Sequence, residues 1–287
     1  MKNYAIILTT FPGRKYGRKI SKELHQLGII SFYCSLNRWP NVFTDHPELN
    51  KNNCVIVARC AHPNNSPSWM QILEDMEEDG WVIINNTNVL KLTSNKLQCS
   101  LFLQNKVNHP KSWECTKSTF HNLQLVNGKY IVKPYVSQSQ GRYVKVFNVI
   151  NGIKESIDIN DIPENKLVVQ EFIDYIAIYR VIVINGRALP YSFVDHPTPE
   201  RWKVSVCLNR TSMQYVPNPN SQLLRLAEQT QREIGGNINY IDIFEKQDGS
   251  FVISEINTSC ILFIHERLSG NNIARKIAEG IKEICYQ

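Results

Sequence analysis

Strands and helices alternate through the first third of the chain, and this alternation limits the chain to a small set of folds. Segments with apolar residues at helical spacing separate the strand-like apolar runs AIILTT, SFYCSL, CVIVA and WVIINN. One helix is predicted from about Tyr16 to Gly28, and another from Ser66-Pro67 to Gly80. The pattern predicts a parallel sheet with right-handed crossovers. No GxGxxG sequence follows these strands, so a dinucleotide site is not supported.

From about Ser112 the sequence becomes rich in strands. Turn signals at Asn151-Gly152 and Asn185-Gly186 join successive apolar runs, as in antiparallel hairpins. The remaining predicted helices are one capped by Thr93 or Ser94, one from Ser221 to Gly235, and one from about Asn271 to Ile284.

The bulk properties are those of a soluble globular protein, and we expect it to be cytoplasmic. The 287 residues are 43% hydrophobic, enough for a sizeable core, and no apolar run is long enough to cross a bilayer. Eight scattered cysteines lack metal-ligand spacing, so we expect most of them to be reduced. The net charge is +6, and the basic stretch from Arg14 to Lys22 favours a solvated helix face over a surface for an acidic partner.

The stretch YIDIFEKQDGSFVISEIN carries the chemistry that the residues themselves suggest. Asp248-Gly249 between two apolar runs predicts a hairpin with a two-residue turn. That turn places Asp242 directly across from Glu255, with Asn257 on the same face. Like charges at opposed positions are destabilising, so something must compensate them.

Two interpretations of this hairpin remain open. Hard oxygen ligands clustered in this way suit Mg²⁺, which binds carboxylates together with substrate phosphates. Alternatively, both acids lie on an open, solvated face. A two-residue turn would pair Phe244 with Ile253 on the face of the acids, which would cover that face and slightly favours the metal.

Beyond the hairpin, the sequence resembles the RimK-like glutamate ligases of the ATP-grasp superfamily. The resemblance is carried by six segments that occur in the order of the family, namely NKLQCSLFLQNKVNHPKS, YIVKPYVSQSQGRYV, VVQEFI, RVIVINGRAL, YIDIFEKQDGSFVISEINTS and SGNNIARKIAEGI. Each segment is weakly specific by itself, whereas their common order is strong evidence.

The resemblance implies an α/β (α+β) protein with the ATP-grasp fold. An N-terminal parallel α/β pre-ATP-grasp domain (1–94) would precede a central lobe (95–175) and a C-terminal lobe (176–287), and the two α+β lobes would clasp ATP.

The resemblance also implies roles for individual residues. Lys133 and Lys96 would contact the nucleotide phosphates, and the loop from Ser137 to Gly141 would cover them. Glu171 and Phe172 would hold the adenine, mostly through backbone groups. Without the family context, each of these side chains would be read as an ordinary surface or strand residue.

The remaining implied roles concern the reaction and the metal. Arg180 would lie near the transferred phosphoryl group or the substrate carboxylate. Asp242, Glu255 and Asn257 would ligate one or two Mg²⁺ ions, with Mn²⁺ as an alternative metal.

The sequence departs from the family pattern at four places. Lys203 and Ser205 stand where the family has Arg-x-Asn, which keeps the charge but loses the bidentate fork. Ile178 replaces an aspartate that contacts the ribose, and Asp174 is the candidate substitute. The phosphate loop is poor in glycine. The turn after the hairpin reads 257-NTSCI-261 instead of Asn-x-Ser-Pro-Gly, which suggests a different acceptor pocket.

The implied function is an ATP-dependent carboxylate–amine ligase that forms an amide through an acyl-phosphate. Its partner would be an amino acid or a peptide, and the positive charge slightly favours an acidic one. The alternatives are a nucleotide-binding ATP-grasp protein without ligase activity and, with less support, a nucleic-acid-binding protein. The oligomeric state stays open, including a homo-oligomer. We expect no membrane partner and no covalent nucleophile at Cys260.

Overall fold

The N-terminal region forms the predicted parallel sheet. The computed structural model describes residues 2–9, 14–35, 39–59, 67–135, 143–163, 165–198 and 212–287. The sheet has the order β2-β1-β3-β4, with all neighbours parallel. Its elements are β1 (Tyr4–Thr9), α1 (Arg14–Gln26), β2 (Ile30–Ser35), α2 (Trp39–Asp45), β3 (Cys54–Arg59), α3 (Pro67–Glu78) and β4 (Val82–Ile84). The glycines predicted to stop α1 and α3 have positive φ, 82° at Gly28 and 94° at Gly80.

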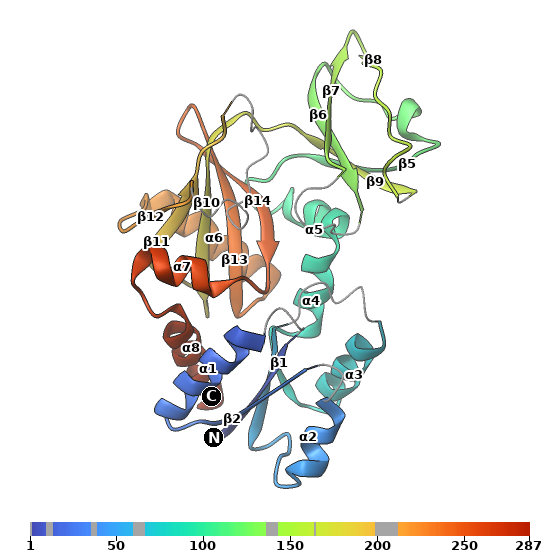
Figure 1. The fold of residues 1–287 in the computed structure, drawn as a ribbon. Helices are drawn as coiled ribbons and strands as arrows, with labels where there is room; N and C mark the ends of the chain where they lie inside the picture. The colour runs from blue at the N-terminus through green and yellow to red at the C-terminus, as the bar shows by residue number, and fades with distance from the viewer. Residues whose placement is uncertain are drawn as a thin grey trace.

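Two short helices connect this sheet to the rest of the chain, and here the predicted cap is wrong. Thr93 and Ser94 end α4 (Thr87–Ser94), while Asn95 caps α5 (Lys96–Leu103) by accepting a hydrogen bond from the Gln98 N–H. The Thr93 hydroxyl donates to the Val89 carbonyl instead, at 2.7 Å. In Figure 1, α4 and α5 rise as a column from the N-terminal sheet towards the central lobe.

The central lobe is an antiparallel sheet of order β5-β9-β6-β7-β8 with a core of its own. Phe120, Tyr130 and Phe147 are the largest side chains in that core. Asn151 and Gly152 both have positive φ, as the predicted tight turn requires. The elements are β5 (Ser112–Thr116), a 3₁₀ turn (Phe120–Asn122), β6 (Gly128–Pro134), β7 (Lys145–Ile150), β8 (Ile153–Lys154) and β9 (Lys166–Glu171).

The C-terminal lobe is an antiparallel sheet of order β12-β11-β10-β13-β14 between two helical layers. On one face, α6 packs on β10, β13 and β14. On the other face, α8 and the turn before α7 share one core with α1 and the N-terminal sheet. The elements are β10 (Tyr175–Ile184), β11 (Arg187–Asp195), β12 (Gln214–Val216), α6 (Ser221–Ile234), β13 (Ile238–Lys246), β14 (Phe251–Asn257), α7 (Leu262–Ser269) and α8 (Ile273–Cys285).

The β13–β14 hairpin corrects the predicted turn but keeps the predicted acidic pair. The Lys246 N–H donates to the Ser250 carbonyl at 2.9 Å, so the loop has three residues, ending at Gly249 with φ 78°. The longer loop shifts the register, and Phe244 pairs with Val252 rather than with Ile253. A bulge at Ser254 then restores the register, and Asp242 lies across from Glu255 as predicted.

Within the described part of the chain, none of the helices has the length and apolar character needed to span a membrane. The six cysteines in that part form no disulfide.

Candidate functional site

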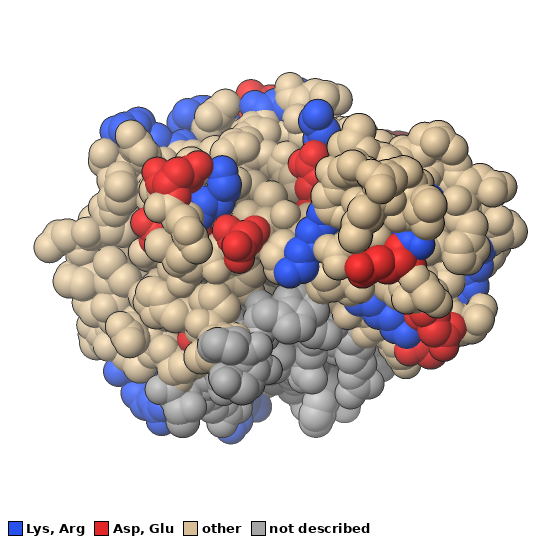
Figure 2. Space-filling view, turned by 90° about the horizontal axis from the view of Figure 1, so that it is seen from above, with Lys and Arg blue, Asp and Glu red and all other residues tan. Residues whose placement is uncertain are grey.

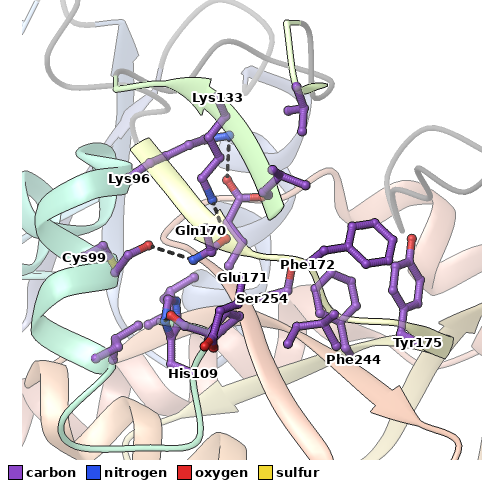
Figure 3. A pocket seen from close by; sticks show the side chains of 18 of the residues that line it. Lys96, Cys99, His109, Lys133, Gln170, Glu171, Phe172, Tyr175, Phe244 and Ser254 are labelled. Atoms are coloured by element: carbon purple, nitrogen blue, oxygen red, sulfur yellow. Dashed lines mark hydrogen bonds and ion pairs between the residues drawn. The ribbon is translucent and has the colours of Figure 1, made fainter. Parts of the chain in front are cut away.

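A cavity lies where the central lobe, α5 and the edge of the C-terminal sheet meet. It encloses about 1030 Å³ of empty space, including its mouth, which is enough for a nucleotide. Figure 3 shows Lys96 and Lys133 at one end, and the rings of Phe172, Tyr175 and Phe244 gathered towards the other. The cavity therefore has a cationic end and an aromatic end.

The periodicity of the surrounding elements places the lining side chains. On β6, Tyr130 and Val132 point into the core of the central lobe, so the alternating Lys133 faces the cavity. On α5, the lining residues Lys96, Cys99, Ser100 and Leu103 recur at the spacing of one helical face.

Lys133 is the central group at the cationic end. Its Nζ donates to Oε1 of Gln170 at 2.9 Å. Burial, and then the charge of Lys96, lower the pKa of Lys133 to about 8, although Glu255 acts in the opposite direction. The Lys96 Nζ lies 3.7 Å from a carboxylate oxygen of Glu255. Two cations that repel each other would be stabilised by an anion between them.

The aromatic end adjoins the connection between the central and C-terminal lobes. The rings of Tyr175 and Phe244 stack with centroids 4.2 Å apart. The predicted adenine residues Glu171 and Phe172 line the cavity, but their N–H groups already donate to the carbonyls of Lys111 and Lys129, at 3.0 Å each. Flat apolar rings are suited to the face of a purine base.

Gln170 and His109 are two of the lining residues that were not predicted. Gln170 is buried and bridges Lys133 to the Ser112 hydroxyl, which accepts from Gln170 Nε2 at 2.9 Å. Its only signal is a polar residue inside the apolar run VVQEFI. His109 is buried, and burial followed by the charge of Lys133 lowers its pKa to about 4. His109 is therefore neutral near pH 7, and no sequence pattern marks it.

Arg180 and Asp242 form a buried pair on neighbouring strands of the C-terminal sheet. They are cross-strand partners on β10 and β13. Nε and Nη2 of Arg180 donate to the two carboxylate oxygens of Asp242 at 2.7 and 2.6 Å. The two side chains are only 3% and 7% exposed. This fork is the strongest geometry that the two groups can adopt.

The predicted metal residues lie together and fit a hard cation. Asp242 lies across from Glu255, and Asn257 across from Tyr240, two pairs further along the same strands. Glu255 also lines the cavity. The buried Asn257 Nδ2 has no hydrogen-bond partner within the described residues, and the two ends of an amide are interchangeable in assignment. Two carboxylates and an amide oxygen are ligands that Mg²⁺ accepts.

In the described ranges there is no group of three or more His, Cys, Asp and Glu residues that could hold a metal. A set of two carboxylates and one amide is consistent with that, because Mg²⁺ in nucleotide sites is usually held by few protein ligands together with phosphate oxygens.

The other predicted site residues are placed as follows. Asp174 does not line the main cavity but an adjoining hollow, which shares Phe172 and Tyr175 with it. Four predicted residues lie outside the described part of the chain, namely Ser137, Gly141, Lys203 and Ser205.

Cys260 and His265 approach each other without forming a thiol–base pair. The His265 Nδ1 lies 3.8 Å from the Cys260 sulfur but 2.8 Å from the Ile261 carbonyl oxygen. A carbonyl only accepts, so Nδ1 carries the hydrogen and is not a base for the thiol. The sulfur instead accepts from Nη1 of Arg180 at 3.2 Å.

Comparison with solved structures identifies the fold as that of ATP-grasp ligases. The ATP-grasp ligase PsnB, solved with a phosphomimetic variant of its minimal precursor, Mg and ADP, matches with TM-score 0.66 and 13% identity over 99% of this chain and 100% of PsnB. D-cycloserine synthetase DcsG matches with TM-score 0.66 and 11% identity over 98% and 99% of the two chains. The D-alanine–D-alanine ligase of Bacillus anthracis matches with TM-score 0.65 and 12% identity over 100% and 98%.

Sequence comparison then identifies the family within the ATP-grasp fold. No curated protein matches this sequence. The profile of the RimK-like ATP-grasp domain matches residues 93–281, about two thirds of the chain. The chain therefore belongs to the RimK-like ATP-grasp family, and the family and fold place it among the ATP-dependent carbon–nitrogen ligases.

Proposed function

We propose that this chain joins a carboxylate to an amine through an acyl-phosphate, with an amino acid or a peptide as substrate. The observation that carries the proposal is a single cavity with Lys96 and Lys133 at one end, aromatic rings towards the other, and the Glu255–Asp242–Arg180 group next to the lysines. The cationic end suits nucleotide phosphates, and the aromatic end suits the base.

In the proposed reaction, a substrate carboxylate attacks the γ-phosphate of ATP and releases ADP. The amine then displaces phosphate from the acyl-phosphate to form the amide. The work of the protein is positioning and charge neutralisation. Lys96 and Lys133 would hold the phosphates, and Arg180, fixed by Asp242, would stabilise the developing charge.

Asp242, Glu255 and Asn257 are the residues that would hold Mg²⁺, or Mn²⁺ in its place. The ion, when bound, would neutralise phosphate charge next to the lysines. The half-exposed Glu255 is the ligand on the cavity side, whereas Asp242 would share its carboxylate between the ion and Arg180.

The named relatives support the substrate class. PsnB was solved with its precursor peptide, and the macrocyclase MdnC with the precursor peptide MdnA. A D-alanine–D-alanine ligase shares the fold. Peptides and amino acids are therefore the first substrates to test.

We also propose the division into an N-terminal domain (1–94), a central lobe (95–175) and a C-terminal lobe (176–287). Three separate sheets support it, and Asn95 caps the first helix of the central unit.

The test is release of ADP and phosphate from ATP and Mg²⁺ in the presence of amino acids and short acidic peptides, with mass spectrometry of the products. A product lighter by one water than its two substrates combined establishes the ligase and names its substrates. Nucleotide binding without turnover across the panel would contradict the ligase and favour a nucleotide-binding role.

A further inference from the structure

Gln170 is a buried polar residue inside the apolar strand β9, where it is 5% exposed. In register it lies directly across from Ser112 on β5. It lies diagonally across from Lys133 on β6, because Lys133 pairs with Val168, two residues earlier on β9. Diagonal neighbours on one face of a sheet are within reach of long side chains. The register of the three strands therefore places the Gln170 amide between Ser112 and Lys133, at the wall of the cavity (Figure 3).

The chemistry of the neighbours fixes the direction of each hydrogen bond that the amide makes. An ammonium only donates, so Oε1 of Gln170 must face the Lys133 Nζ, 2.9 Å away. The amide nitrogen then donates to the Ser112 Oγ at 2.9 Å. The Ser112 hydroxyl gives its own hydrogen to the Pro110 carbonyl at 3.1 Å, which leaves its oxygen free to accept. A directed chain therefore runs from the ammonium through the amide and the hydroxyl to a main-chain carbonyl.

The acceptor of the Lys133 ammonium is neutral, although a carboxylate acts on it from nearby. Among the described residues, that carboxylate is Glu255 on β14, which forms an ion pair with Lys96 on α5 at 3.7 Å. Cys99 on α5 and His109 also face the ammonium. Burial raises the pKa of the Cys99 thiol to about 12 and lowers that of His109 to about 4, so both are neutral near pH 7. The amide therefore holds the ammonium without neutralising it.

We propose that Gln170 is a positioning residue, which fixes the Lys133 ammonium against the nucleotide phosphates while leaving its charge available to them. A carboxylate at position 170 would hold the ammonium as firmly but would cancel the charge that attracts the phosphates. Ser112 fixes the amide from the other side. This inference rests on the proposed function, because it requires that Lys133 contacts the phosphates.

The first test is a double-mutant cycle on the affinity for ADP, measured by calorimetric titration of the full chain at one fixed Mg²⁺ concentration. Its four proteins are the wild type, Gln170→Leu, Lys133→Met and the double variant. Gln170→Leu should weaken ADP binding by about tenfold, as loss of a hydrogen bond to a charged group implies. In the Lys133→Met background it should have no further effect, because the glutamine acts through the lysine. Gln124→Leu, which changes an exposed glutamine of the central lobe, is the matched control and should bind like wild type.

The second test separates the position of the ammonium from its charge. Gln170→Glu keeps the size of the side chain and an acceptor oxygen for Lys133, but it adds a negative charge. Its affinity for ADP at pH 7 should be about tenfold weaker than that of wild type. Its affinity should begin to fall only well above pH 8, because the carboxylate raises the pKa of Lys133. In Gln170→Leu the fall should begin below pH 8, because an acceptor that stabilises the charged form is lost. A merely structural role of the glutamine would not move the two profiles in opposite directions.

The proposal is overturned if Gln170→Leu binds ADP as tightly as wild type. It is also overturned if this substitution weakens binding equally with and without Lys133, because the glutamine would then act on the fold rather than on the lysine. Wild-type affinity of Gln170→Glu at pH 7 would show that a neutral acceptor is not needed. Equal affinity of Lys133→Met and wild type would overturn the phosphate contact and this inference together. These measurements need no turnover, so failure to form an amide with any substrate would contradict the proposed ligase and leave the role of Gln170 in nucleotide binding in place.

Discussion

Lys133 combines burial, a nearby like charge and a position facing the cavity, and these conditions explain its lowered pKa of about 8. Replacing Lys133 with Met should weaken ADP binding by about tenfold or more, because a charged donor to phosphate is lost. Calorimetric titration measures this affinity. Lys106→Met, which removes an exposed lysine paired with Glu233, is the matched control. Equal affinity in Lys133→Met and wild type would show that the phosphates bind elsewhere.

The lowered pKa of Lys133 predicts that the affinity for ADP depends on pH. Lys133 loses its charge as the pH rises through about 8, below its ordinary value of 10.5. ADP affinity should therefore fall above pH 8, by up to about tenfold per pH unit, and less so in Lys133→Met. Without nucleotide, the unfolded chain binds more protons than the native one between pH 8 and 10.5, so this lysine makes stability rise across that window. An ADP affinity that is independent of pH from 7 to 9.5 would contradict the contact of Lys133 with the nucleotide phosphates.

Asp242 and Glu255 face each other but differ in burial, so their substitutions should separate stability from metal binding. Asp242→Asn leaves Arg180 without its buried counter-charge and should cost about 3 kcal/mol or more in the free energy of unfolding. Glu255→Gln changes a side chain that is 41% exposed, and stability should change by about 0.5 kcal/mol or less. It should nevertheless raise the Mg²⁺ concentration needed for half-maximal ADP formation. Denaturant titration measures the change in stability, and a Mg²⁺ titration measures the change in metal requirement. An unchanged Mg²⁺ requirement in Glu255→Gln would show that Glu255 is not a ligand of the metal.

Among the secondary-structure elements, the β13–β14 hairpin shows both the reach and the limit of sequence patterns. Alternation and Asp248-Gly249 predict the hairpin and its acidic pair, but not the three-residue loop or the bulge at Ser254, whose effects on register cancel at Asp242. Local turn chemistry does not determine where an extra residue is absorbed. Nor does it predict the pairing of Arg180 with Asp242, because that register joins strands 62 positions apart in the sequence.

The hairpin loop itself makes a testable element. Gly249 has φ 78°, a conformation that costs an L-residue about 1–2 kcal/mol. Gly249→Ala should therefore destabilise the protein by about 1 kcal/mol, and Gly249→Asn by less, since asparagine tolerates this region better. Urea unfolding compares the three proteins. Equal losses for Ala and Asn would show that backbone conformation is not the cause.

For the whole molecule, the sequence predicts the three regions but not how they share their cores. The parallel N-terminal sheet and the strand-rich remainder follow from periodicity, and the family resemblance places the cavity between the lobes. Helix α8 joins α1 and the N-terminal sheet to the C-terminal lobe in one core. This shared core depends on packing between the two ends of the chain, which lie side by side in Figure 1. In the described part of the face seen in Figure 2, acidic and basic side chains are interspersed, and these described residues form no broad basic surface for a polyanion.

This division of the cores predicts two units of unfolding. The shared core includes Ile277 of α8, while the central lobe has a separate core around Phe147. Ile277→Ala should cost about 2–5 kcal/mol, and Phe147→Ala about 3–5 kcal/mol. Because cooperative units follow contiguous cores, Ile277→Ala should speed amide exchange in β1, β10 and β13 together, and Phe147→Ala only in β6, β7 and β9. Native-state hydrogen exchange at low denaturant measures this. If Phe147→Ala speeds exchange equally in β1, the lobes unfold as one unit, and the central lobe is not free to open and close over the nucleotide independently of the rest.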